Sequence, residues 1–316
     1  MNPILTSFRQ TLRSPRLLWL LYGVTLGLAL LAALPFYATL QTETGRSLAF
    51  ENLLGGFDYT VFSDFWHRSG RAVSPLVRVG RWLGVLYLGL SVFFAGGILW
   101  RFSQPGARFD AGTFWAACSQ YVGRYVRLLG VTGLFVLVGA GIWLVIGALT
   151  EVVLSDTLTE RGQFWVGFGF FGLFFLTATL VLCIGDYAKV LMFREDERRA
   201  FRAFGRAGRL VLSNLGATFG RYWLLILIGT GLFALYFLLD DLITMRNWPT
   251  IIILLVVQQA LIFARVALKV WSLGTAYHVY EHLPKPAPML RPVPVEQPTP
   301  TNVAPVIPSL PADDAE

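Results

Sequence analysis

Six long apolar stretches, separated by charged segments, dominate the pattern of hydrophobic and polar positions along the chain. Each contains an uncharged run of at least 18 residues, and a helix needs about 20 residues to cross a bilayer. We expect six transmembrane helices, at about 17–40, 82–100, 128–150, 162–185, 222–239 and 247–268. The pattern therefore predicts an all-α integral membrane fold, with a six-helix transmembrane bundle in residues 1–282.

The two ends of the chain depart from this pattern. The first apolar stretch is much longer than the roughly 7–15 residues of a signal-peptide core, and no small-x-small cleavage site follows it, so we expect an uncleaved anchor. Residues 283–316 are rich in proline and lack apolar periodicity. We expect this segment to be a disordered cytoplasmic tail, extended and polyproline-like.

Charged residues are scarce, and their placement predicts the orientation of the bundle. Only 14% of the 316 residues are charged, and the mean hydropathy is +0.59. With the N-terminus in the cytoplasm, 19 of the 26 lysines and arginines fall on the cytoplasmic side and seven outside. The positive-inside rule therefore favours cytoplasmic N- and C-termini, although four arginines between Arg68 and Arg81 fall in the first outer loop.

The most basic segment, FREDERRAFRAFGRAGRLVLSN, occupies 193–214 between the fourth and fifth stretches. On a helix that Asp196 caps, one face is apolar: Phe193, Phe201, Phe204, Ala207 and Val211. The other face carries Arg198, Arg202, Arg206 and Arg209. We expect an amphipathic helix that lies in the headgroup plane on the cytoplasmic side of the membrane. Its arginines would bind the headgroups of anionic lipids. Its apolar face and its position between two spans argue against nucleic acid as the partner.

A similar order of elements occurs three times along the chain. The tripeptide Gly-Arg-Tyr recurs at 123–125 and 220–222, each time just before an outward-going span. Before the first span, Leu5, Phe8 and Leu12 lie opposite Arg9 and Arg13 on a helix. The sequence therefore predicts three units, each with a basic interfacial helix, a span outward and a span back.

No pattern of catalytic or metal-ligating residues stands out. His278, Glu281 and His282 match the H-x-x-E-H arrangement, in which two imidazoles one turn apart share a zinc ion. The further acidic ligand would have to come from the proline-rich tail, so we expect no metal. Cys118 and Cys183 lie far apart in apolar surroundings, which is typical of packing residues. We expect no cofactor and no enzymatic activity.

Two glutamines fall inside the last apolar stretch. Gln258 and Gln259 lie roughly 16–18 Å along it from Asn247, near the middle of a bilayer. Amides at this depth either line a solute path or hydrogen-bond neighbouring helices. Both alternatives remain open from the sequence.

Four charged residues reach the cytoplasmic boundary at similar depth: Asp186, Arg221, Arg265 and Lys269. An unpaired carboxylate is costly at this depth, because little water is present to solvate it. We therefore expect Asp186 to contact one of the three cations, within a polar cluster that also includes the two glutamines.

Three segments carry a resemblance to known proteins. They are GDYAKVLMFREDERRAFRAFGRAGRLVLSN at 185–214, FAGGILWRF at 94–102 and QQALIFARVALKVWSLGTAYHVYE at 258–281. These segments resemble uncharacterised bacterial polytopic membrane proteins akin to the membrane domain attached to some glycerophosphodiester phosphodiesterases. The resemblance implies an all-helical bundle in the bacterial inner (cytoplasmic) membrane. In such enzymes catalysis belongs to a soluble partner domain, which we do not expect here.

Two functions fit these patterns. The first is a non-enzymatic membrane protein whose basic helices engage anionic lipid headgroups or partner proteins. Glycines such as Gly139 and Gly167 favour close helix packing, within one bundle or in a homo-oligomer. The second is a small-solute transporter or channel with Gln258 and Gln259 lining its path. The lack of a mid-span proline in the last five spans favours the first function.

The predicted orientation is testable with a reporter that is active only in the cytoplasm. We predict that fusions after Arg127, Arg209 and Pro284 are active and that fusions after Glu51 and Asp156 are silent, because the basic segments remain inside. An active fusion after Glu51 would contradict this topology.

Overall fold

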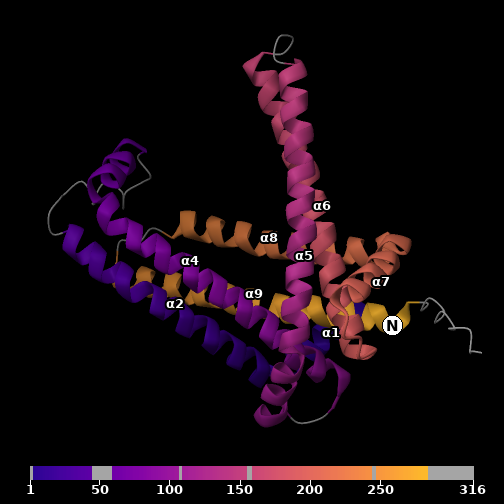
Figure 1. The fold of residues 1–316 in the computed structure, drawn as a ribbon. Helices are drawn as coiled ribbons and strands as arrows, with labels where there is room; N and C mark the ends of the chain where they lie inside the picture. The colour runs from indigo at the N-terminus through magenta and orange to yellow at the C-terminus, as the bar shows by residue number, and fades with distance from the viewer. Residues whose placement is uncertain (1–2, 45–58, 107–108, 155–158, 244–246, 284–316) are drawn as a thin grey trace, which may run out of the picture. The chain divides into compact units, whose positions relative to one another are not determined.

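The computed structural model describes residues 3–44, 59–106, 109–154, 159–243 and 247–283. In these ranges the chain forms helices joined by short turns, without a strand. The helices are α1 (Pro3–Leu12), α2 (Pro15–Thr44), α4 (Tyr59–Ser103), α5 (Ala111–Leu154), α6 (Glu160–Arg194), α7 (Ala200–Ser213), α8 (Leu215–Leu242) and α9 (Trp248–His282) (Figure 1). The predicted all-α fold is confirmed for this part of the chain. The tail from Pro284 onward lies outside the described residues.

Six of these helices, all except α1 and α7, are long and apolar enough to cross a membrane. Their exposed surfaces support the same conclusion. No residue is buried in α5 from Gly133 to Leu154 or in α6 from Glu160 to Ala178. At 1.5 Å per residue these two arms are about 33 Å and about 28 Å long, close to the roughly 30 Å of a bilayer's hydrocarbon core. The structure thus indicates a multi-pass membrane protein.

Buried side chains gather at the other ends of the same helices. One core joins the start of α2, the end of α4, the first half of α5, the end of α6, the buried face of α7 and the second half of α9. Its fully buried members include Leu17, Leu99, Phe114, Tyr125, Val190 and Val270. Helix α9 contacts α1, α2, α4, α6 and α8, so it is the central helix of the bundle.

Two phenylalanine–glycine contacts set the spacing of the helices in this core. The Phe114 ring of α5 occupies the position that a Cβ on Gly97 of α4 would take, and the Phe102 ring of α4 does the same at Gly274 of α9. Both rings are almost fully buried. Because glycine has no side chain, each ring lies directly against the backbone of the neighbouring helix, and α4 is held between α5 and α9.

The start of α5 differs from the predicted three-unit order. Asp110 precedes the helix, and its carboxylate accepts a hydrogen bond of 2.9 Å from the Thr113 backbone N–H. This bond lowers the pKa of Asp110 below its usual value. From Ala111 the helix continues without a break to Leu154. The second basic segment is therefore part of a span, whereas α1 and α7 are separate helices that precede α2 and α8.

The basic helix α7 begins later than predicted. Its first residue is Ala200, and Asp196 does not cap it. Instead, Asp196 has a positive φ of 49°, which aspartate tolerates better than most residues, and its carboxylate pairs with Arg124 of α5. This pair lowers the pKa of Asp196. Arg198 therefore lies in the turn between α6 and α7 and is not part of the helix.

The apolar face of α7 packs inside the protein. Its buried residues are Ala200, Ala203, Phe204, Ala207, Leu210 and Val211. Helix α7 contacts α5, α6 and α8, and the Phe204 ring stacks on Phe135 with centroids 4.7 Å apart. Phe193 belongs to α6, and Phe201 is 64% exposed, so these two residues are not part of the buried face.

Helix α1 packs on α9 through three polar contacts. The hydroxyls of Ser7 and Thr275 lie 2.8 Å apart, and the indole of Trp271 donates to the Ile4 carbonyl at 3.0 Å. Gln10 Oε1 lies 3.0 Å from His278 Nε2. The Phe8 ring of α1 also packs on Trp271, with centroids 4.8 Å apart. Phe8 still keeps part of its surface exposed, and Leu5 and Leu12 are more exposed than Phe8.

We predict that Gly97→Ala destabilises the protein in detergent by about 1–3 kcal/mol, because the new methyl group overlaps the Phe114 ring. Gly84 is the matched control: it lies on the same helix with no heavy atom within 4 Å of an added Cβ. Gly84→Ala is expected to leave stability unchanged or to raise it by up to about 1 kcal/mol. Equal unfolding midpoints for the two variants, followed by tryptophan fluorescence, would contradict the proposed spacing role.

Candidate functional site

A cavity of about 770 Å³ lies among α2, α4, α6, α8 and α9. Its walls are largely apolar, and several hydroxyl, amide and charged side chains interrupt them. The polar side chains that line it are Thr25, Tyr87, Ser91, Asp186, Lys189, Tyr222, Thr230, Gln259, Arg265, Lys269 and Ser272. Of the predicted polar cluster, four residues therefore meet in one cavity: Asp186, Gln259, Arg265 and Lys269.

Two cations on α9 reach opposite walls of the cavity. Arg265 and Lys269 are four residues apart, so they lie one above the other on the same side of the helix. The Arg265 guanidinium lies over the Phe233 ring of α8, 4.5 Å from its centroid. Lys269 Nζ lies 5.1 Å from the Tyr87 ring centroid on α4. The aromatic faces stabilise both cations, and neither cation has an ion-pair partner among the residues that the structure describes.

The carboxylate of Asp186 has a different partner from the three predicted. Its Oδ1 accepts a hydrogen bond of 2.7 Å from Lys189 Nζ, one turn further along α6. The two side chains are 25% and 23% exposed. The pair forms within α6 because residues three apart are neighbours on a helix. The lining then carries three positive charges and one negative charge, a formal net charge of +2.

The two glutamines of α9 contact different helices. Gln259 Oε1 accepts a hydrogen bond of 2.7 Å from the Tyr22 hydroxyl of α2, and Gln259 lines the cavity. Gln258 Nε2 donates to the Tyr236 hydroxyl of α8 at 2.9 Å, outside the cavity. Adjacent residues on a helix point about 100° apart, which follows from 3.6 residues per turn. Arg221 does not line the cavity either.

The arginines predicted to face lipid are partly engaged within the protein. Arg206 forms an ion pair of 2.5 Å with Glu195, and Arg202 lies 3.9 Å from Glu197. Glu195 also accepts a hydrogen bond of 2.5 Å from Tyr280. Arg209 is exposed and has no ion-pair partner in the described part of the chain. Glu195 and Glu197, which lie just before α7 in the sequence, thus pair with two of its arginines, Arg206 and Arg202.

The residues of the H-x-x-E-H motif join helices at the same end of the bundle. Glu281 pairs with Arg194 of α6 at 2.5 Å, and the Arg194 guanidinium lies 4.8 Å from the Tyr277 ring centroid. His278 lies between Glu281, at 3.7 Å, and Gln10 of α1. Among the described residues, no group of three potential metal ligands comes together.

Sequence reasoning did not identify the aromatic partners of the cavity. Tyr22, Tyr87 and Phe233 lie on three different spans. The position of each residue in the sequence gives its place along its span, but it does not show which side of that span faces α9. The hydroxyl groups of Tyr22, Tyr87 and Tyr222 within apolar stretches were the available signal, because tyrosine usually finds a polar partner when buried.

A comparison of the chain with protein-family models, with curated proteins and with solved structures finds no match.

We predict that Asp186→Asn destabilises the protein in detergent by about 1–2 kcal/mol, between the values typical of exposed and buried ion pairs. The physical reason is that Lys189, Arg265 and Lys269 then share a cavity without a carboxylate. Adding Lys189→Met to this variant should recover part of the loss, which a double-mutant cycle of unfolding free energies measures.

The matched control is Asp196→Asn, since Asp196 pairs with Arg124 at an exposed site. Its expected effect is smaller, because solvent screens exposed pairs. A loss for Asp186→Asn no greater than that for Asp196→Asn would argue against an electrostatic role for Asp186 in the cavity.

Proposed function

We propose that the protein is a small-solute transporter that binds a small organic anion in the cavity. The observation that carries this proposal is the convergence of Lys189, Arg265 and Lys269 on one cavity that contains a single carboxylate, Asp186. The cavity volume of about 770 Å³ falls within the roughly 300–1,000 Å³ of typical small-ligand sites.

The chemistry of the lining favours an anion with an apolar body. Charges in a medium of low dielectric interact more strongly than in water, so an excess of positive charge there is stabilised by a bound anion. Arg265 and Lys269 rest on aromatic rings, and this contact leaves their N–H groups available as donors. Apolar residues such as Leu225, Ile226 and Ile262 supply a surface for the remainder of the ligand.

The position of the cavity along α9 is compatible with a solute path. The lining extends from Gln259 to Leu273, 14 residues or about 21 Å along the helix. It thus runs from the middle of the predicted last span to the end where the basic residues gather. In this proposal that end faces the cytoplasm of a bacterium, with the protein in the inner membrane.

A second candidate function is the binding of anionic lipid by a basic helix, and α1 favours it more than α7 does. Leu5, Phe8 and Leu12 are exposed on α1, and the exposed Arg9 and Arg13 lie next to them and not on the opposite face that the sequence predicted. An exposed apolar row beside cations fits a helix in the headgroup plane. On α7 most of the apolar face is already buried, which leaves Phe201, Leu212 and exposed arginines such as Arg209 for lipid.

We predict that liposomes containing the protein release trapped hexyl phosphate faster than they release tetraethylammonium. The double variant Arg265→Gln/Lys269→Gln should slow the release of hexyl phosphate about tenfold, since removing two exposed cations costs about 1 kcal/mol or somewhat more. The comparison variant Arg202→Gln/Arg209→Gln removes two cations from α7 and should leave the rate unchanged.

Equal rates for the anion and the cation would overturn the proposal. Loss of flux in the α7 variant together with normal flux in the cavity variant would favour the second candidate, lipid binding by the basic helices.

A further inference from the structure

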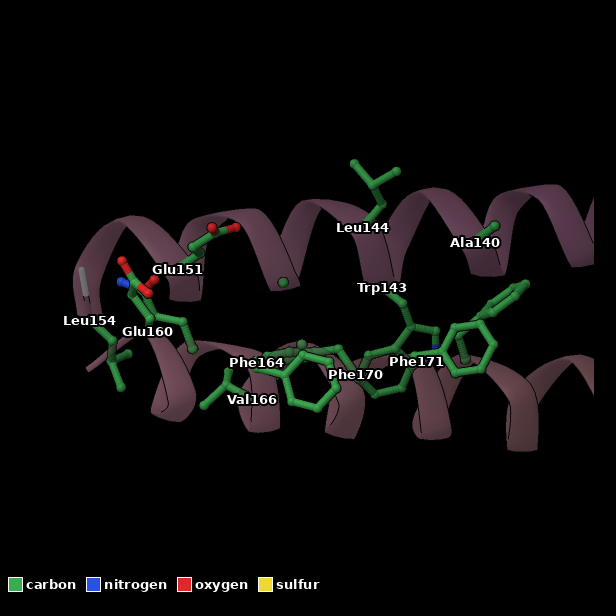
Figure 2. Close-up of a pocket in the computed structure, with 14 residues that line it drawn as sticks. Ala140, Trp143, Leu144, Glu151, Leu154, Glu160, Phe164, Val166, Phe170 and Phe171 are labelled. Carbon is green, nitrogen blue, oxygen red and sulfur yellow. The ribbon is translucent and has the colours of Figure 1, made fainter. Parts of the chain in front are cut away.

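A second large cavity, an open groove of about 640 Å³, lies between the arms of α5 and α6 (Figure 2). Aromatic rings line its length: Trp143 extends from α5, and Phe164, Phe170 and Phe171 extend from α6. Phe164 and Phe171 are 66% and 62% exposed. Since no residue of either arm is buried, these rings are available to a ligand or to lipid.

Two local features shape this groove. Gly147 of α5 faces the Phe170 ring, which would lie 3.6 Å from an added Cβ, so the absence of a side chain there leaves space between the helices. Trp143 donates its indole N–H to the Thr177 hydroxyl of α6 at 3.0 Å. With its polar edge satisfied in this way, the indole presents its aromatic face next to Phe170, with ring centroids 6.2 Å apart.

Two carboxylates lie at the end of the groove. Glu151 lies near the end of α5 and Glu160 is the first residue of α6, and both lie on the groove wall (Figure 2). Neither has an ion-pair or hydrogen-bond partner among the described side chains. Arg161 follows Glu160 directly but is not one of the lining residues. Both side chains are exposed, so a cation bound at this end of the groove would interact with both charges without first displacing a protein partner.

We propose that this groove binds an amphipathic cation: a single hydrocarbon chain lies along the aromatic rings, and an ammonium group lies between Glu151 and Glu160. Carboxylates and aromatic faces are the two protein groups that attract an ammonium ion, the first by charge and the second through the ring quadrupole. The groove offers both at one end and a continuous apolar wall beyond them. This inference is independent of the proposed anion transport, because the two cavities share no lining residue.

The charges of the groove favour a ligand without phosphate. A zwitterionic phospholipid would bring its phosphate close to two carboxylates, and no lysine or arginine lines the groove to compensate for it. The occupant we infer is therefore an alkylammonium compound, and ordinary membrane lipid is the alternative that the experiment must exclude.

Trp143 provides the readout, because bromine quenches tryptophan emission at contact distance. The full chain in a neutral detergent is titrated with an ω-brominated alkyltrimethylammonium and, separately, with the matching brominated alkyl sulfate. The Trp143 signal is the difference between the wild-type protein and Trp143→Phe, which removes the contribution of the other tryptophans. We expect the ammonium compound to quench this signal at a mole fraction about tenfold lower than that of the alkyl sulfate, which is the gain typical of two exposed ion pairs.

Two double variants identify the source of the preference. Glu151→Gln/Glu160→Gln should abolish the difference between the two head groups while quenching by the alkyl chain persists. Asp240→Asn/Asp241→Asn, which removes two carboxylates from the end of α8 outside the groove, should leave the preference intact. Release of hexyl phosphate from liposomes should be the same in both variants, so failure of this inference is distinguishable from failure of the transport proposal.

Three results would overturn the inference. The first is equal quenching by the two head groups in the wild-type protein, which would identify the groove as a lipid-facing surface. The second is a preference that survives the glutamine substitutions. The third is quenching by a brominated phosphatidylcholine as strong as that by the ammonium compound, which would make membrane lipid the occupant.

Discussion

Close approach of three helices at two glycines is the constraint on which the rest of the structure depends. At Gly97 and Gly274 a phenylalanine ring lies directly against the backbone of the next helix, which holds α4 between α5 and α9. The end of α6, helix α7 and the start of α2 then complete one buried core around these contacts. A side chain at either glycine would push the ring away, and the helices would separate within the core that contains most of the buried side chains of the described residues.

Two large cavities accompany this core: one lies beside it, and the other lies between the arms of α5 and α6, where no residue is buried. The space among α2, α4, α6, α8 and α9 receives the cations of α9, whose partners are aromatic rings on α8 and α4. The space between α5 and α6 receives carboxylates and phenylalanines. The same architecture thus produces one cationic and one acidic cavity, and this separation of charge is the strongest argument that each has a ligand of its own.

The sequence was sufficient to predict the long apolar helices and several of the polar residues that meet in one cavity. Charge-free runs show which segments are apolar enough to cross a membrane, and counting residues along two helices placed Asp186 near Arg265 and Lys269. It did not predict which side of each helix faces the cavity, so Gln258 was grouped with Gln259 although they contact different helices. The sequence also did not predict which partners the two aspartates would take. Asp186 pairs with Lys189, one turn away on the same helix. Asp196 binds Arg124 and does not cap α7. Such contacts depend on side-chain geometry, which helical periodicity alone does not specify.

The unequal burial along each helix has a consequence for how the protein tolerates sequence change. In the arms of α5 and α6 no side chain is buried, so exchange among leucine, isoleucine, valine and phenylalanine there should cost little free energy as long as the segment stays apolar. A few turns away on the same helices, truncation of a residue such as Tyr125 or Val190 opens a void in a packed interior, which costs about 2–5 kcal/mol for large side chains. Related sequences should therefore diverge in the arms while retaining their residues in the core, and the positions in the arms that resist this divergence, Glu151 and Glu160 among them, would be those that bind a ligand.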